Sequence, residues 1–175
     1  YNLKVTEMQA AVGLAQLEKF PAFAEARRKN WAYLRKVLAP FERRLILPES
    51  APKSDPCWFG FLIIVKDNAG FTRNQLVAHL EKNRIQTRML FAGNLIKHPC
   101  FDEMRRSGKG FRVVAAQPPR SFRPSAFSSH PSSFPHLPNT DHAMNSAFWI
   151  GVYPGMTGEM LRYTAGVFGS FRGLS

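Results

Sequence analysis

The sequence predicts an α/β or α+β fold, and three observations support that prediction. A long helical stretch at residues 7–39 opens the chain behind a capping signal. Two apolar runs, at residues 58–65 and 147–153, are short enough and rich enough in β-branched and aromatic residues to be buried strands. A capping signal and a helical pattern follow each run. Strands that alternate with helices are typical of α/β and α+β folds.

The first helix begins at a capping box formed by Thr6 and Gln9. Pro21 removes one backbone donor, so we expect a kink or a restart there, followed by helix to about Ala39. Small apolar residues recur at helical spacing in the first half, which predicts close packing against a neighbouring element. These residues are Ala11, Leu14, Ala15 and Leu17.

The middle of the chain alternates strand and helix. After the strand at 58–65, Thr72 and Gln75 form a second capping box, and the helix behind it stops near Asn83. Residues 85–90 read as another strand. The loop 91–94 leaves its end, and residues 99–104 form a short turn or helix.

Residues 115–138 are rich in proline and serine and contain no acidic residue. Proline cannot donate to a regular hydrogen-bonded ladder, so we interpret this segment as a disordered or irregular insertion. Beyond it, Asn139 is expected to cap a short helix through Asn145, and Thr157 to cap a last helix over about 158–168.

This pattern divides the chain into four parts. Residues 1–40 are the long helical part, 41–114 the first part of a small domain, 115–138 the irregular insertion, and 139–175 the last strand and helix.

Composition excludes several classes of protein. No stretch of 18 apolar residues is present, and the first residues do not resemble a signal peptide, so we expect no membrane span and a cytoplasmic location. Two isolated cysteines, Cys57 and Cys100, argue against a disulfide framework and a zinc site.

The formal charge of +12 is concentrated in residues 19–47. A basic segment of this kind is either a solvated helix face, which meets an acidic partner in some proteins, or a nucleic-acid-binding surface. We favour the solvated face, because no aromatic and basic recognition motif accompanies the charge. Nucleic acid is therefore not the expected partner, although a basic binding module stays open as an alternative function.

No catalytic constellation stands out from the residues alone. The chain contains no G-x-S-x-G, H-E-x-x-H or Walker motif. His130, His136 and His142 are spaced by six, which does not suit metal ligands on a helix. Asp102 and Glu103 are adjacent and make a poor acid–base pair. We expect no catalytic residue and no metal ligand in this chain.

The opening segment YNLKVTEMQAAVGLAQL, residues 1–17, resembles a signature of the DegT/DnrJ/EryC1/StrS family of sugar aminotransferases and dehydrases. Four further segments resemble the branch of CDP-4-dehydro-6-deoxyglucose 3-dehydrases, which are lipopolysaccharide biosynthesis proteins. These segments are WFGF at 58–61, TRMLFAGNL at 87–95, NTD at 139–141 and FWIGVYPG at 148–155. The resemblance covers nearly the whole chain outside 115–138.

The resemblance implies the aspartate-aminotransferase architecture, fold type I, of which this chain would supply the small C-terminal domain and the long interdomain helix. It implies a homodimer with active sites at the subunit interface, pyridoxal phosphate (PLP) or pyridoxamine phosphate (PMP) as cofactor, and a nucleotide-sugar substrate. Full-length relatives in this branch also use a [2Fe-2S] cluster. Its ligands and the catalytic histidine or lysine lie upstream of the matched segment, and neither Cys57 nor Cys100 matches a cluster ligand.

The resemblance also implies site residues. Asn2 would reach the cofactor phosphate of the neighbouring subunit, with Lys4 beside it, and Arg88, Phe91 and Asn94 would belong to a substrate-facing loop. Without the resemblance, Asn2 reads as a cap or turn residue and Arg88 as a surface cation at a strand end.

The expected function is therefore the C-terminal part of a PLP- or PMP-dependent nucleotide-sugar 3-dehydrase of deoxysugar biosynthesis. By itself the chain is expected neither to hold the cofactor firmly nor to turn over. A sugar aminotransferase is the alternative, and the loop 91–94 argues against it, because aminotransferases of the family carry a loop with proline and histidine there. His98 stands where the branch resemblance implies glutamine.

Overall fold

The computed structural model describes residues 3–110 and 137–174. The chain divides into two compact units, residues 1–91 with 146–175 and residues 92–145. Each unit is described separately below.

The first unit is built on a four-stranded sheet in the order β1-β2-β4-β3 among the described residues. The strands are β1 Leu45–Ile46, β2 Gly60–Val65, β3 Thr87–Met89 and β4 Ala147–Gly151, and all neighbours are antiparallel. Phe61 lies opposite Ile150, and Ile63 opposite Phe148. The expected strands are present but shorter than predicted, and β1 was not predicted.

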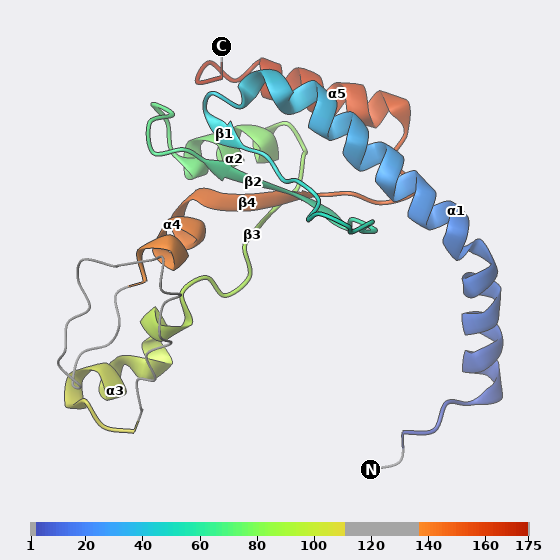
Figure 1. The fold of residues 1–175 in the computed structure, drawn as a ribbon, viewed down its shortest axis with the longest axis horizontal. Helices are drawn as coiled ribbons and strands as arrows, with labels where there is room; N and C mark the ends of the chain where they lie inside the picture. Colours follow the sequence, from blue (N-terminus) through green and yellow to red (C-terminus); the bar gives the residue numbers. More distant parts are fainter. Residues whose placement is uncertain (1–2, 111–136, 175) are drawn as a thin grey trace. The chain divides into compact units, whose positions relative to one another are not determined.

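One face of the sheet carries the core. Successive strand residues point to opposite faces, and β2 alternates half-buried and buried positions, with Phe61, Ile63 and Val65 buried. Three helices lie over this face (Figure 1): α1 Glu7–Leu38, α2 Arg73–Lys82 and α5 Gly158–Gly169. They contribute the buried residues Leu34, Leu38, Leu76, Leu80, Leu161, Val167 and Phe168.

The helix α1 begins at Thr6, whose hydroxyl accepts from the Gln9 amide, so the predicted capping box is confirmed. The helix runs through Pro21 without a break, so the expected restart is wrong. Proline removes one hydrogen bond of the ladder, but Pro21 is exposed and the nearby alanines favour helix. The axis bends in the N-terminal half of the helix (Figure 1), which agrees with the alternative expectation of a kink.

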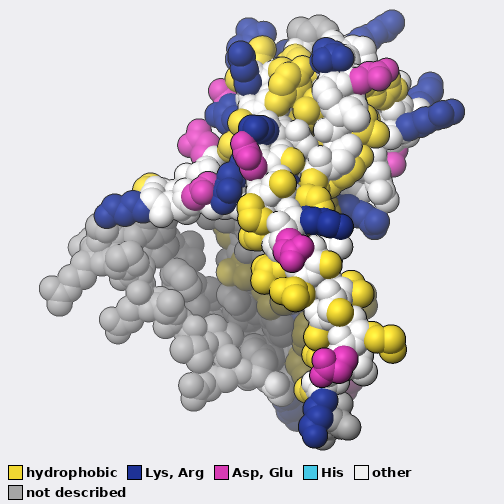
Figure 2. Space-filling model, turned by 90° about the vertical axis from the view of Figure 1, so that its right-hand side faces the viewer, with side chains coloured by type: hydrophobic (Ala, Val, Ile, Leu, Met, Phe, Trp, Pro, Cys, Tyr) yellow, Lys and Arg dark blue, Asp and Glu magenta, His cyan; other side chains and the backbone are white. Residues whose placement is uncertain are grey.

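Only the C-terminal half of α1 packs on the sheet. Every described residue from 3 to 23 is exposed, and burial begins at Ala24. Apolar side chains follow the exposed half in Figure 2. The large exposed apolar residues of this half include Met8, Val12, Leu14, Leu17 and Phe20. The small apolar stripe is thus not covered by any described part of this chain.

Two polar side chains fasten the packed half of α1 to the ends of β2 and β4. The Arg27 guanidinium donates through one nitrogen to the carbonyl oxygens of Trp58 at 3.1 Å and Val152 at 2.7 Å. The Asn30 amide donates to the Tyr153 carbonyl at 2.9 Å. These donors satisfy backbone acceptors where the strands stop, so they fix the helix against the sheet.

The second unit holds short helices. After the 3-10 turns Leu95–Lys97 and Pro99–Phe101 comes α3 Asp102–Ser107, and α4 Pro138–Ser146 reaches the boundary with the first unit. The expected cap at Asn139 is wrong, because the helix already begins at Pro138, whose fixed φ and missing N–H suit a first helical position. Most of the predicted irregular segment, including His130 and His136, lies outside the described residues.

The caps predicted at Thr72 and Thr157 are confirmed. The Thr72 hydroxyl accepts from the Gln75 amide, and the Thr157 hydroxyl accepts from the Met160 amide. Among the helices that the structure describes, none has the length and apolar character that a membrane span would need.

Candidate functional site

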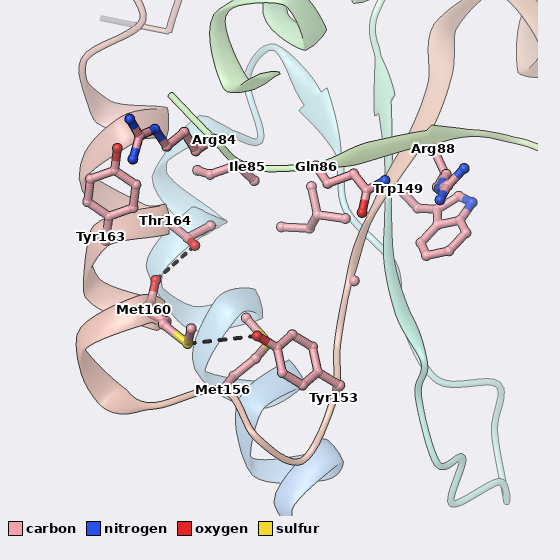
Figure 3. Close-up of a pocket in the computed structure, with 12 residues that line it drawn as sticks. Arg84, Ile85, Gln86, Arg88, Trp149, Tyr153, Met156, Met160, Tyr163 and Thr164 are labelled. Carbon is pink, nitrogen blue, oxygen red and sulfur yellow. Dashed lines mark hydrogen bonds between the residues drawn. The ribbon is translucent and has the colours of Figure 1, made fainter. Parts of the chain in front are cut away.

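A cavity of about 570 Å³ lies beside the edge strand β3 in the first unit. Its walls come from the turn before β3, from β4 with the turn that follows it, and from one face of α5 (Figure 3). The residues that line it are Arg84, Ile85, Gln86, Arg88, Trp149, Ile150, Gly151, Tyr153, Met156, Met160, Tyr163 and Thr164.

Arg88 lines this cavity from the edge strand, and its register in β3 sets the direction of its side chain. It pairs with Trp149 of β4, so both side chains leave the sheet on the face opposite the core. Thr87, one residue earlier, points to the other face and is buried. The alternation places the exposed Arg88 guanidinium of β3 next to the Trp149 indole of β4, the strand with which β3 pairs.

Glu81 anchors β3 from the end of α2. Its carboxylate accepts from the backbone N–H of Thr87 at 2.6 Å and from the Thr87 hydroxyl at 2.7 Å. These two donors, the backbone N–H first, lower the pKa of Glu81 below its ordinary value, and the nearby charge of Arg88 acts in the same direction. The edge strand next to Arg88 is therefore held by a charged acceptor.

The opposite wall of the cavity carries the aromatic rings of Tyr153 and Tyr163 and the thioether groups of Met156 and Met160. The Tyr163 hydroxyl donates to the Asn83 carbonyl at 3.1 Å, and the Thr164 hydroxyl donates to the Met160 carbonyl at 2.9 Å. The Tyr153 hydroxyl lies 3.8 Å from the Met160 sulfur (Figure 3). Fixed tyrosine rings beside exposed guanidinium groups can bind an anionic ligand that also has a planar or apolar part.

The indole N–H of Trp149 is a further donor at this site. It is buried and has no hydrogen-bond partner among the described residues. An unpartnered buried donor costs about 1–3 kcal/mol, so an acceptor supplied by a ligand or by protein outside the described part would stabilise it.

The structure places the two other loop residues differently. Phe91 is 75% exposed and adopts φ +40, just beyond β3, where its N–H bonds to the Met89 carbonyl. Asn94, in the second unit, is buried, and its amide donates to Asp141 at 2.8 Å. Arg88 and Phe91 thus expose their side chains, whereas Asn94 turns its side chain inward.

Of the two expected cofactor contacts, the structure describes only Lys4. Asn2 falls outside the described residues, and Lys4 is exposed just before α1. Free amides at a helix N-terminus attract phosphate, and a lysine beside them adds charge. Residues 3–23 are all exposed, so no described residue encloses the start of α1.

The described residues contain no group of three or more His, Cys, Asp and Glu side chains that could hold a metal ion. Both cysteines are exposed free thiols.

Sequence reasoning missed four residues that shape these sites: Glu81, Trp149, Asp141 and Met144. Trp149 and Asp141 lie in segments that resemble the family, but nothing in their sequence context assigns them a partner. Their partners are far away along the chain, and only the folded sheet and loop bring them together.

Comparison with known proteins identifies the class to which this fold and site belong. The model of the DegT/DnrJ/EryC1/StrS aminotransferase family matches residues 1–124, and the chain belongs to this family. Among curated relatives, the chain is 44% identical over 175 residues to the lipopolysaccharide biosynthesis protein RfbH of Salmonella typhimurium, which covers all of this chain and 34% of the relative.

A second relative is the dTDP-4-dehydro-2,6-dideoxy-D-glucose 3-dehydratase of Saccharopolyspora spinosa. It is 42% identical over 163 residues, which is 93% of this chain and 30% of the relative. The chain thus spans about a third of the length of these curated relatives.

Solved structures confirm the expected fold. The Escherichia coli GDP-4-keto-6-deoxy-D-mannose-3-dehydratase with bound hydrated PLP superposes with a TM-score of 0.69 at 23% identity, covering 95% of this chain and 36% of that one. An aminotransferase from Psychrobacter cryohalolentis gives 0.72 at 18% identity, covering 99% and 40%. At these identities the similarity establishes the fold, that of the PLP enzymes of fold type I.

Proposed function

We propose that this chain forms the C-terminal third of a PLP- or PMP-dependent nucleotide-sugar 3-dehydratase, and that the cavity beside β3 binds part of the substrate. One observation supports this most strongly. Two of the four segments that resemble the 3-dehydrase branch beyond the opening helix, 87–95 and 148–155, contribute neighbouring strands that pair, with Arg88 opposite Trp149. Both residues line one cavity, together with Tyr153 from the second segment.

In this proposal the chain binds and orients the substrate. The exposed Arg88 guanidinium binds a phosphate or hydroxyl oxygen of the nucleotide sugar, and the Trp149 indole donates to a second acceptor. Glu81 keeps β3 in place while these contacts form. When bound, the cofactor supplies the electron sink that the elimination of a hydroxyl requires. Lys4 would touch its phosphate from the start of α1.

The proposal extends to assembly. Since no described residue encloses the start of α1, the remaining cofactor contacts come from protein outside these residues and from a second subunit in a homodimer. The [2Fe-2S] cluster expected for this branch is likewise proposed for the remainder of the protein, with no ligand from Cys57 or Cys100.

A sugar aminotransferase is the second candidate, because solved aminotransferases share the fold, as the Psychrobacter protein does. The curated relatives that cover most of this chain include a 3-dehydratase, which favours the first candidate. The two differ in the use of an amino donor. Transfer of an amino group from glutamate to the keto sugar would identify the aminotransferase.

A replacement experiment tests the proposal. The matching third of Salmonella RfbH is exchanged for residues 1–175, and the hybrid is produced in a Salmonella strain that lacks RfbH. The proposal predicts a hybrid that binds PLP, judged by visible absorbance, and that restores lipopolysaccharide synthesis, judged by gel profile. A folded hybrid that holds PLP but leaves the lipopolysaccharide defect unchanged would contradict it.

A further inference from the structure

The second unit contains a cluster of contacts around the segment 92–98, which follows β3 and Phe91. We propose that Asp141 and Met144 of α4 are positioning residues that hold this segment in its bound-state shape. Neither residue reacts with substrate. They act through the segment, and their functional effect rests on the proposed function together with the implication of the family resemblance that Phe91 and Asn94 belong to a substrate-facing loop.

Asp141 binds the segment at two points with its two carboxylate oxygens. Oδ1 accepts from the Asn94 amide nitrogen at 2.8 Å, and Oδ2 accepts from the Lys97 ammonium at 2.8 Å. The Asp141 side chain is 15% exposed, and Asn94 is 1% exposed. A hydrogen bond from a buried amide to a charged acceptor is stronger than one between neutral groups, so this contact is a firm attachment.

Met144 lies one turn further along α4 and packs on the same segment. Gly93 adopts φ +65, and a Cβ built there would lie 2.5 Å from Met144 Cγ. Only glycine therefore permits both this backbone conformation and this close approach. The Asn94 backbone N–H also points to the Met144 sulfur at 3.3 Å. Gly93 and Asn94 are thus held by the side chains of Asp141 and Met144, which lie one turn apart on α4.

The segment is closed on its other side as well. The His98 ring nitrogen Nε2 lies 2.6 Å from the Ala92 carbonyl oxygen, a contact in which Nε2 carries the proton and donates. Arg105 of α3 donates to the carbonyls of Ile96 and His98. A glutamine at position 98 could donate to the same carbonyl through its side-chain amide.

The contacts of Asp141 and Met144 with residues 92–98, which we call the clamp, explain why Asn94 is buried although its neighbours resemble a substrate loop. The Asn94 side chain orients the loop backbone through Asp141, and exposed groups next to it can then meet the substrate. Loss of the Asp141 carboxylate should loosen residues 92–98, which belong to the same unit as Asp141, while the sheet of the first unit stays intact.

Amide hydrogen exchange in the 175-residue chain tests the clamp directly. Asp141→Ala should raise exchange of the 94–98 amides at least about tenfold, and Asp141→Asn should raise it less, because the amide oxygen still accepts. Glu103→Ala, an exposed acid of the same unit, is the matched control and should change nothing. Unchanged exchange of the β2 and β4 amides shows that the fold persists. Exchange at 94–98 equal to wild type in Asp141→Ala would overturn the proposal.

A second pair of variants tests Met144. Gly93→Ala alone should increase exchange of the segment, because the new methyl group meets Met144. Gly93→Ala with Met144→Ala should recover part of the protection, since the close contact is removed while the strained φ remains. Equal exchange in the single and double variants would contradict a packing role of Met144.

The functional arm uses the RfbH hybrid described above with CDP-4-dehydro-6-deoxyglucose as substrate. Asp141→Ala should raise KM about tenfold with kcat within about twofold, because the loop is misplaced and the chemistry is untouched. A loosened segment with unchanged KM would overturn the positioning role and the substrate-facing loop, while leaving the Arg88 contact to be tested separately. A proportional fall in kcat would contradict a purely positioning role.

Discussion

At the scale of single residues, several basic side chains of α1 are bound by groups elsewhere in the chain, and these partners show whether a charge has a structural role. Arg27 donates to two backbone carbonyls, Arg28 pairs with Asp55 at 2.9 Å, and Arg35 pairs with Glu42 at 2.6 Å. These arginines serve the fold of their own unit. Their engagement supports the interpretation of a structural helix face over a nucleic-acid surface.

Asn30 provides the first prediction. It is a buried polar residue whose amide donates to the Tyr153 carbonyl. Asn30→Ala should lower the free energy of unfolding by about 1–3 kcal/mol, because it leaves that carbonyl without its donor. Urea unfolding followed by circular dichroism measures the change. Asn68→Ala, at an exposed turn, is the control and should stay within about 0.5 kcal/mol of wild type.

Glu81 provides a pH-dependent prediction. Its pKa in the folded protein is below the ordinary value of 4.5, so its contribution to stability is complete above that value and disappears as the pH falls through the lower, folded-state pKa. Glu81→Gln should therefore destabilise the chain at pH 7 and have a progressively smaller effect as the pH falls below the ordinary value of 4.5 and through the folded-state pKa.

The measurement is the difference in urea midpoint between Glu81→Gln and wild type across this pH range. Many carboxylates titrate in the same window, so only the difference between the two proteins is informative. A difference that is the same at both ends of the range would show that the contact with Thr87 does not shift the titration of Glu81.

At the scale of elements, the sequence predicted those features that depend on residues close together in the chain. The capping boxes at Thr6 and Thr72 and the cap at Thr157 are set by residues three apart, and all three are found. The strand β1 was missed because two residues, Leu45 and Ile46, are too few to show a period of two. It exists because it pairs with the end of β2.

The candidate site was also predictable only in part. The strand pattern placed Arg88 near a strand end, where the structure shows it exposed at the cavity. The inward position of Asn94 was not predictable, because its partner Asp141 lies in α4, which follows the proline-rich segment in the sequence. Long-range contacts of this kind leave no periodic trace in a single sequence.

The helix α1 provides a prediction about local stability. Its first half is exposed and its second half is buried against the sheet, and an exposed helix of this length is only marginally stable in water. In the 175-residue chain, amides of residues 10–22 should exchange at least about tenfold faster than those of residues 28–38. Residue-resolved hydrogen exchange by nuclear magnetic resonance measures this. Uniform protection along α1 would mean that the exposed half is covered, for example by a second copy.

At the scale of the whole molecule, the described residues include a folded sheet unit with an exposed helical arm, and in our proposal they supply only part of a cofactor site. We therefore predict that titration of the purified chain with PLP produces no stoichiometric complex with visible absorbance at micromolar concentrations. A tight, saturable complex would show that the described residues suffice for cofactor binding and would refute the proposal that other protein completes the site.

The most direct measurement is the affinity of the PLP-loaded RfbH hybrid for CDP-4-dehydro-6-deoxyglucose, with and without Arg88. The account predicts that Arg88→Ala weakens binding at least about tenfold, as expected for loss of one charged hydrogen bond, with cofactor absorbance unchanged. Arg43→Ala, an exposed arginine away from β3, should bind like the parent hybrid. Equal affinity in the parent and in Arg88→Ala would contradict the claim that the cavity beside β3 receives the substrate.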